Sequence, residues 1–330
     1  MKLLFALFLF FIFQSAQAQP KIENLVFEGA GIRGLAYAGV VKELESRNML
    51  PAVKRVGGTS AGAIIALMIS LQYTSSEIAE IIGSTEFKKF NDGRFFFAGG
   101  INRLRKYFGW YRGNRFEKWL SLLIEAKTGN GDITFEQAIA SGYKELYITG
   151  TNLSKQKAVV FSVRDFPHMK LKDAIRISMS IPLYFEPLFM NNSGQIIKQP
   201  KDKSKVSVMV DGGIIANYPI TLFDDTGVIS KPNFNTLGFR IDSDAQIEKD
   251  ENNDGLATLN IHSLPQYVTA FYTMIIENLN RQKLTAADWQ RTVSISDGGL
   301  GPRIRKLTNA ETITLIENGR KAVSVYLSKK

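Results

Sequence analysis

The chain has 330 residues, of which 45% are hydrophobic and 22% charged, a composition that excludes a disordered, collagen-like or coiled-coil protein. It has no cysteine and only two histidines, His168 and His262, which excludes disulfides, a thiol nucleophile and a histidine-rich metal site. The formal net charge of +10 is explained first by solubility. The second interpretation is an anionic partner, either a membrane surface or nucleic acid.

The N-terminus has the three parts of a secretory signal. Met1-Lys2 is a positive start, residues 3–13 form an unbroken apolar run, and Ala16-Gln17-Ala18 is a small-x-small cleavage site. The apolar run is shorter than the roughly 20 residues that a membrane span needs. We therefore expect a signal peptide at 1–18 and a soluble, exported mature protein, periplasmic or secreted, formed by residues 19–330.

Short apolar runs that end in glycine turns alternate with helical spacing along the chain. The pattern predicts strands at 24–27, 53–56, 146–150, 159–162, 206–210 and 236–241, and helices at 34–47, 63–71, 116–127 and 171–179. The polar tract 191–205 and the acidic tract 242–254 are predicted to be exposed loops. Strands that alternate with helices predict an α/β fold with a largely parallel sheet covered on both faces.

The first motif that carries chemistry is a G-x-S-x-G sequence between a predicted strand and a predicted helix. Its residues are Gly58, Thr59, Ser60, Ala61 and Gly62. Such a turn exposes the serine at the edge of the sheet, and the helix N-terminus favours negative charge on its oxygen. The alternative is a tight turn in which the serine only caps the helix.

A glycine loop precedes this turn. It follows the first predicted strand and consists of Gly29, Ala30, Gly31, Ile32, Arg33 and Gly34. Its G-x-G-x-x-G pattern is typical of dinucleotide binding, but the second strand lacks the acidic residue that would bind the ribose. The other use is an oxyanion hole built from backbone N–H groups. For Arg33 there are then three possible roles. It holds the loop in place, it adds positive charge near the oxyanion hole, or it faces solvent.

A D-G-G turn follows the fifth predicted strand. Asp211 stands before Gly212 and Gly213, and an aspartate at the carboxyl end of a parallel strand is placed to accept the serine proton. The alternative is a plain Asp-Gly turn. Asp297-Gly298-Gly299 repeats the pattern near the end of the chain, and we interpret it as a turn.

Together these three features resemble one family, the bacterial patatin-like phospholipases. The likeness covers about residues 24–223, and residues 224–330 match weakly. Three flanking segments agree with it: Gly109–Gly113, Ser178–Pro182 and Asp211–Pro219.

The resemblance implies a three-layer α/β/α fold with a nucleophile elbow in one catalytic domain. It implies a Ser–Asp dyad, with Ser60 as nucleophile, Asp211 as general base and the glycine loop as oxyanion hole, and it implies no cofactor or metal. Neither His168 nor His262 stands in a segment that suggests a catalytic base, which agrees with a dyad. One departure is Ala30, where the family often has a third glycine; the hole survives if this residue has a negative φ.

The implied function is a lipid acyl hydrolase of the phospholipase A or lysophospholipase type, with lipid as substrate. A non-catalytic lipid- or membrane-binding protein on the same fold is the alternative. Residues 250–254 imitate the start of a calcium loop, but the twelfth position is Ile261, so we reject an EF-hand.

Segment 86–119 points to a partner. It contains nine Lys or Arg, three acidic residues and eleven aromatic residues, among them Phe95-Phe96-Phe97. Cations interleaved with aromatic rings suit an anionic lipid interface, and beside a lipolytic site they favour peripheral membrane contact over nucleic acid. Part of the segment is expected to cap the active-site cleft. The sequence makes no prediction of the oligomeric state.

Overall fold

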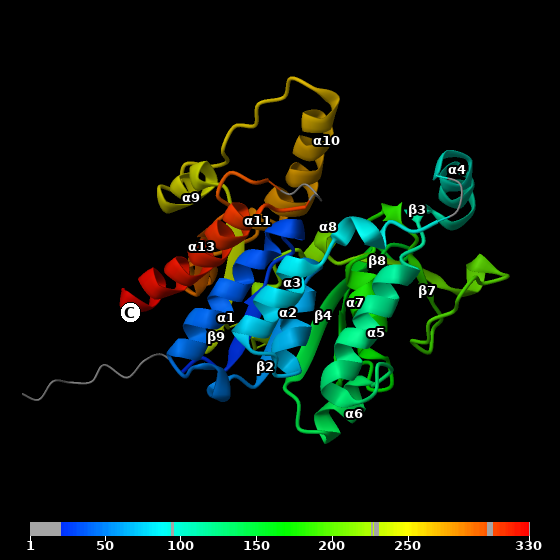
Figure 1. Cartoon of the computed structure of the whole chain (residues 1–330), viewed down its shortest axis with the longest axis horizontal. Coiled ribbons are helices and arrows are strands. Elements are labelled where there is room, and N and C mark those ends of the chain that lie inside the picture. Colours follow the sequence, from blue (N-terminus) through cyan, green and yellow to red (C-terminus); the bar gives the residue numbers. More distant parts are fainter. Residues whose placement is uncertain (1–20, 94–95, 226, 228–230, 302–305, 330) are drawn as a thin grey trace, which may run out of the picture.

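The computed structural model describes residues 21–93, 96–225, 227, 231–301 and 306–329, and only the backbone at 96–98, 265 and 279 (Figure 1). The predicted signal peptide, residues 1–18, lies outside the described residues.

All six predicted strands are present, and the described residues form four more. The strands are β1 (Asn24–Phe27), β2 (Arg55–Gly58), β3 (Gly109–Tyr111), β4 (Glu145–Asn152), β5 (Lys157–Phe161), β6 (Leu183–Phe185), β7 (Leu188–Met190), β8 (Ser207–Asp211), β9 (Thr236–Asp242) and β10 (Thr292–Ser296).

The four predicted helices correspond to α1, α2, α5 and α7. The α-helices are α1 (Ala36–Ser46), α2 (Ala61–Ser70), α3 (Ser75–Ser84), α4 (Phe96–Tyr107), α5 (Asn114–Thr128), α6 (Phe135–Ala140), α7 (Leu171–Ser178), α8 (Gly213–Ala216), α9 (Asp244–Glu251), α10 (Leu264–Tyr272), α11 (Leu279–Arg281), α12 (Ala286–Gln290) and α13 (Asn309–Ser328). The 3-10 turns are η1 (Gly31–Leu35), η2 (Leu50–Ala52), η3 (Phe87–Phe90), η4 (Lys203–Lys205) and η5 (Ile220–Phe223), and η6 (Thr273–Asn278) is a π-helical turn.

The central sheet is mostly parallel, which confirms the predicted fold class. β10, β9, β1, β2 and β4 lie side by side in that order, and each pairs in parallel with the next. One expectation is wrong: β8, the strand that carries Asp211, runs antiparallel to β4. β5 and β7 also form antiparallel pairs, with β4 and β8 respectively.

The register of β4 brings the ends of two strands together. β5 pairs with β4 over residues 148–152, so it occupies one edge of β4. The other edge of β4 must therefore be shared by β2 and β8. The last residue of β2 pairs with Ile148, and Asp211 of β8 pairs with Gly150. Because β2 and β8 run in opposite directions, their carboxyl ends face each other. The turn after β2 and the aspartate that ends β8 meet at this point.

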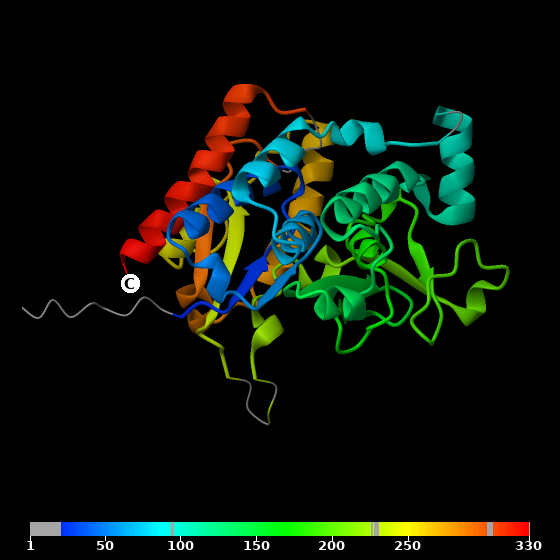
Figure 2. The same cartoon turned by 60° about the horizontal axis from the view of Figure 1, so that its bottom comes forward.

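Alternation along β1 divides the core between the two faces of the sheet. Leu25 and Phe27 are buried in the large cluster that includes the helices α1, α2 and α13. Val26, between them, faces a smaller cluster built around η5. Figures 1 and 2 show α1, α3 and α13 stacked over one face, and the thinner layer around η5 on the other. This arrangement is the predicted three-layer α/β/α architecture.

The two predicted loops have different outcomes. Residues 191–202 contain no helix or strand, and η4 ends the tract. The acidic tract 242–254, in contrast, contains the helix α9. Ser243 caps its N-terminus by accepting a hydrogen bond from the Gln246 amide, and Arg281 forms ion pairs with Asp242 and Asp250. The loop was predicted because the tract is acidic, and this distant cation offsets the repulsion between its carboxylates.

Candidate active site

Ser60 occupies a strained turn between β2 and α2, as the G-x-S-x-G motif predicts. Its backbone has φ 52° and ψ −121°, a conformation rare for a residue with a side chain. The flanking glycines are required by space. A Cβ on Gly58 would meet the Gly62 carbonyl, and one on Gly62 would meet the Phe27 carbonyl. The Ser60 amide donates a hydrogen bond to Ser178 Oγ at 2.9 Å, which holds the turn in place.

Thr59 and Ala61, the other two residues of the elbow, contact buried parts of the structure. The Thr59 hydroxyl is buried and donates to the Ala216 carbonyl at 2.8 Å, and it lies 2.5 Å from the Thr149 hydroxyl. Ala61 begins α2, whose residues from Gly62 to Ser70 are all buried. A helix that is apolar on every side belongs in a core. Ser60 therefore stands at the N-terminus of a helix that is buried along its length.

Asp211 ends β8 and is 3% exposed. Its Oδ1 accepts a hydrogen bond from the Gly213 amide at 2.7 Å, and a Cβ on Gly212 would meet Thr149, so both glycines of the D-G-G turn have structural roles. Its buried Oδ2 accepts no hydrogen bond from the described residues. Burial raises the pKa of Asp211 to about 7, against the Gly213 amide and the Ser60 hydroxyl, which both lower it.

The two side chains meet at the head-to-head junction of β2 and β8. The Ser60 hydroxyl donates to Met179 Sδ at 3.4 Å, a weak acceptor, and it is close enough to Asp211 to affect the pKa of that carboxyl. The Ser60 hydroxyl thus rests on a weak acceptor beside Asp211, whose Oδ2 accepts no hydrogen bond from the described residues. The arrangement can remove the serine proton without a histidine.

The glycine loop lies beside Ser60 and is tied down by Asn217. The Gly29 amide donates to the Asn217 carbonyl at 3.1 Å, and Asn217 Nδ2 donates to the Gly29 carbonyl at 3.1 Å. Gly29 therefore does not offer its N–H to an oxyanion, which corrects one part of the predicted hole. Gly34, at the other end of the loop, packs against Ala61, where a Cβ would lie 3.0 Å from the Ala61 Cβ.

Within the loop, Ala30 has φ −133° and Gly31 has φ +57°. Alanine at position 30 is therefore unstrained, and the positive φ of Gly31 is a conformation that favours glycine. The chain then enters η1, whose first amides have no partner inside the helix. The amides of Ala30, Gly31 and Ile32 are the remaining candidates for the oxyanion hole.

Arg33 is buried beneath this loop and does not face solvent. Its Nε donates to the Ala30 carbonyl at 3.2 Å, its Nη2 lies 2.6 Å from Glu277, and its Nη1 lies 3.8 Å from Asp297. Although burial lowers the pKa of Arg33, these carboxylates hold it above the ordinary value. Of the roles open to Arg33, the structure supports the one that holds the loop. The second D-G-G motif is a turn, as predicted, with Gly298 and Gly299 both at positive φ.

Sequence reasoning assigned no role to Ser178, Asn217 or Glu277. Glu277 does carry a signal, since it is the single acidic residue between Asp254 and Asp288. An isolated acid in an apolar stretch is buried only when it has a partner. Nothing in the sequence identifies Arg33 as that partner, because 244 positions separate them.

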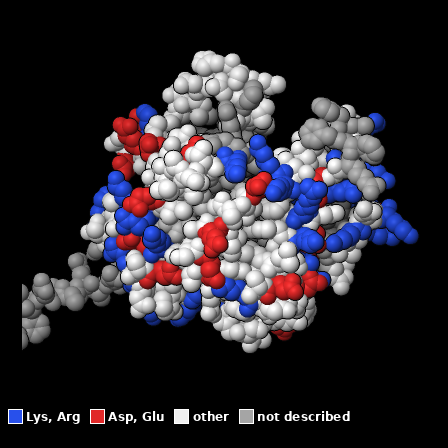
Figure 3. Space-filling view, viewed as in Figure 1, with Lys and Arg blue, Asp and Glu red and all other residues white. Residues whose placement is uncertain are grey.

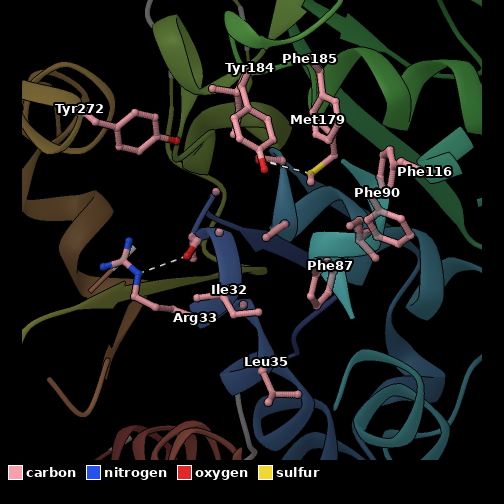
Figure 4. Close-up of a pocket in the computed structure, with 18 of the residues that line it drawn as sticks. Ile32, Arg33, Leu35, Phe87, Phe90, Phe116, Met179, Tyr184, Phe185 and Tyr272 are labelled. Carbon is pink, nitrogen blue, oxygen red and sulfur yellow. Dashed lines mark hydrogen bonds between the residues drawn. The ribbon is translucent and has the colours of Figure 1, made fainter. Parts of the chain in front are cut away.

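A cavity of about 270 Å³ opens beside Ser60 (Figure 4). The glycine loop and Ser60 form its polar end, and its walls are mostly apolar. Wall residues include Leu35, Ile64, Ile65, Ile82, Phe87, Phe90, Phe116, Met179, Ile181, Tyr184, Phe185, Val268 and Tyr272. Phe90 and Phe116 pack edge to face with ring centroids 5.2 Å apart.

This wall accounts for part of the aromatic segment 86–119, which was expected to cap the cleft. Phe87, Phe90 and Phe116 line the cavity. The side chains of Phe95, Phe96 and Phe97 lie outside the described residues.

Neither histidine lies in the site. The His168 side chain is 84% exposed and pairs with Glu136 at 3.1 Å, and His262 is also exposed. In the described part of the chain, no group of three or more His, Asp or Glu residues could hold a metal ion. No described helix has the length and apolar character needed to cross a membrane.

Comparisons with known proteins agree with this architecture. The chain is 31% identical over 209 residues to an uncharacterized protein of Acanthamoeba polyphaga mimivirus, covering 63% of each, and 33% identical over 209 residues to the uncharacterized protein YqhO of Bacillus subtilis, covering 60% of this chain and 65% of YqhO. The chain thus spans slightly less than two thirds of either relative.

Among solved structures, VipD from Legionella pneumophila superposes with a TM-score of 0.58 at 15% identity. The superposition covers 94% of this chain and 67% of VipD, which shows a shared fold. The sequence profile of the family described as patatin-like phospholipase matches residues 25–224, which is more than half of the chain. Relatives come from a virus as well as a bacterium, so the match does not depend on a bacterial source. The chain belongs to the patatin-like phospholipase family.

Proposed function

We propose that this protein is a lipid acyl hydrolase of the phospholipase A or lysophospholipase type that uses a Ser60–Asp211 dyad. The observation that carries the proposal is the pairing of a strained serine with a buried carboxylate whose Oδ2 has no donor among the described residues, at the polar end of an apolar cavity. A lipid-binding protein needs the cavity, but it does not need this strain or this unpaired carboxylate.

In the proposed mechanism, Ser60 Oγ attacks the ester carbonyl carbon while Asp211 Oδ2 takes the hydroxyl proton. The negative charge that forms on the carbonyl oxygen is stabilised by the first amides of η1. As the C–O bond breaks, Asp211 returns the proton to the leaving alcohol, and the acyl group remains on Ser60. Water then attacks the acyl-enzyme and gives a proton to Asp211. The proton passes back to Ser60 as the fatty acid leaves.

The cavity supports a lipid acyl chain as the group that is bound. Beyond the polar end near Ser60, its walls are aliphatic and aromatic, and burial of a chain against them is favourable by about 0.8 kcal/mol per methylene. The ester carbonyl then lies near the serine and the loop amides, where the polar groups of the site are found.

The test is fatty-acid release from mixed anionic phospholipid vesicles by the purified protein. We expect release by the wild type, and a loss of about a thousandfold or more in Ser60→Ala and Asp211→Asn. His168→Ala and His262→Ala are matched controls for a dyad and should keep wild-type rates. Loss of activity in either histidine variant would contradict the dyad. Vesicle binding without hydrolysis in the wild type would favour the non-catalytic lipid-binding alternative.

A further inference from the structure

Helix α10 leaves an apolar stripe exposed. Leu264 is 74% exposed, Phe271 60% and Met274 61%, and Tyr267 and Val268 between them are 59% and 57% exposed. Their spacing of three to four residues places them on one face of α10 and of the π-helical turn η6 that continues it, in which Met274 lies. None of the side chains described in α10 is fully buried. A stripe of this size on one helix face marks an interaction surface.

The segment around this stripe carries no charge. From Leu256 to Ile276 the sequence has no Asp, Glu, Lys or Arg. Charged residues are the usual means of keeping an exposed face in water, and even polar protein interfaces include them at the rim. A long uncharged face suits contact with an apolar medium.

The same helix forms part of the cavity wall. Val268, Thr269 and Tyr272 line the cavity that contains Ser60, so the exposed stripe is continuous with the edge of the site. In Figure 4, Tyr272 enters from the side opposite the phenylalanine wall. An ester that leaves an acyl layer in contact with α10 would meet the cavity without crossing water.

Cations stand on the other side of the cavity. Lys88, Lys89, Arg112 and Arg115 are exposed beside the aromatic wall. Figure 3 shows Lys and Arg side chains gathered over η3 and the start of α5, across from the uncharged lobe that contains α10. An apolar lobe on one side and basic side chains on the other match a surface of anionic headgroups over acyl chains.

We propose that the exposed stripe of α10 is the surface that inserts into an anionic phospholipid bilayer and brings the cavity to its substrate. The proposal rests on the proposed function for its purpose, but binding can be measured without hydrolysis. In this proposal the apolar contact with the membrane is made by α10, and not by the aromatic residues of segment 86–119 that line the cavity. The basic residues of that segment contact the lipid headgroups.

The experiment measures co-sedimentation with vesicles of phosphatidylcholine and phosphatidylglycerol in a Ser60→Ala background. The docking variant is Leu264→Ser/Phe271→Ser/Met274→Ser, none of which lines the cavity. The control is Leu122→Ser/Ile313→Ser/Val325→Ser, which removes side chains that are 56%, 67% and 43% exposed on α5 and α13. We expect the docking variant to lose about tenfold or more in vesicle affinity and the control to stay within about twofold.

A second readout uses the same triple variants with Ser60 intact. Both should hydrolyse a water-soluble, monomeric short-chain ester at the wild-type rate, whereas only the docking variant should lose hydrolysis of vesicle lipid. Failure of the proposed function would appear as no ester hydrolysis in any protein while vesicle binding still depends on α10.

Three results would overturn the docking proposal. The first is equal vesicle binding by the docking and control variants, and the second is no vesicle binding by the Ser60→Ala parent. The third is a parent protein that sediments as a dimer in solution while the docking variant is a monomer, which would assign the stripe to a second copy of the chain.

Discussion

At the scale of single residues, Asp211 is under two opposed demands. In the proposed mechanism it must be ionised to take a proton from Ser60, yet its burial favours the neutral form and raises its pKa to about 7. A base whose pKa lies near the working pH combines a sufficient ionised fraction with a strong tendency to take the proton. Among the described residues, Oδ1 accepts a hydrogen bond from the Gly213 amide and Oδ2 accepts none, which leaves Oδ2 for the proton transfer that we propose.

The pH dependence of hydrolysis follows from this pKa. We expect kcat/KM on a monomeric ester to be constant above about pH 8 and to fall about tenfold per pH unit below pH 7, because protonated Asp211 accepts no proton. A pH–rate profile from pH 5 to 9 measures it. A profile that stays flat down to pH 5 would mean that Asp211 is not the base.

The same group makes the fold less stable as pH rises. In the folded protein Asp211 holds its proton up to about pH 7, whereas in the unfolded chain it loses it near 3.8, so stability falls as pH rises between these values. Asp211→Asn keeps an acceptor for the Gly213 amide and removes the buried charge. We expect urea unfolding to show the variant more stable than wild type by roughly 2–4 kcal/mol at pH 8, and equal to it near pH 4.

Sequence reasoning finds the two turns that carry Ser60 and Asp211, but it does not find the hydrogen-bond partners of the residues around them. Ser60 and the D-G-G aspartate are visible because each stands in a turn that needs glycine. The commitment of the Gly29 amide to Asn217, and of Arg33 to Glu277, depends on partners 188 and 244 positions away, and no local pattern records such pairs.

At the scale of elements, two helices cross through a pair of glycines. Gly39 of α1 faces the Ile316 carbonyl of α13, and Gly319 of α13 faces the Ala36 carbonyl of α1. A Cβ at either position would overlap backbone, which flexible side chains cannot relieve. Glycine otherwise weakens a helix, so these two are explained by the close approach.

Gly319→Ala should therefore destabilise the protein by roughly 1–3 kcal/mol, measured by urea unfolding. Gly83→Ala is the matched control, because Gly83 lies in α3 and its new Cβ would meet only the Thr312 methyl at 3.8 Å. That variant should be unchanged or gain up to about 1 kcal/mol from helix propensity. Equal effects of the two substitutions would mean that the crossing is not close-packed.

Elements beyond residue 241 were not predicted, and their contacts explain why. The exposed apolar stripe of α10 breaks the rule that apolar spacing marks a buried face. α10 continues into the π-helical turn η6, which carries Glu277 to Arg33 under the glycine loop. π-helical turns are frequent at functional sites, and this one joins the proposed docking helix to the loop beside Ser60.

At the scale of the whole molecule, the segment that matches the family weakly completes the fold. β9 pairs with β1 from Asn24 to Phe27, the whole of β1, and all seven residues of β9 are buried. The Phe239 ring stacks on Phe27 with centroids 5.0 Å apart, and Arg240 lies 3.1 Å from the buried Glu28. The sequence predicts the strand β9 but neither β10 nor α13. An apolar run indicates that a strand is present, but it does not indicate which strand lies beside it in the sheet.

A chain that ends at residue 224 should therefore fail to fold. It would expose the edge of β1 that pairs with β9, leave the Phe27 ring without Phe239 and Glu28 buried without Arg240, and remove both carboxylates that hold Arg33. We expect no cooperative unfolding transition in circular dichroism and no hydrolysis of a water-soluble ester. A cooperative, active truncated protein would show that β9, β10 and α13 are an accessory layer.

Single substitutions test the role of β9 in the core of the full-length chain. Phe239 is fully buried against Phe27, whereas Phe234, five residues earlier, is 54% exposed. Phe239→Ala should lower the free energy of unfolding by about 3–5 kcal/mol through the lost transfer energy and the cavity, and Phe234→Ala should change it by less than about 0.5 kcal/mol. Because the Glu28 amide and the Tyr37 hydroxyl both donate to the Phe239 carbonyl, a backbone contact that the substitution retains, the glycine loop should keep its position. Phe239→Ala should then lose stability while its folded fraction retains hydrolysis, which separates the role of β9 in the core from the chemistry at Ser60.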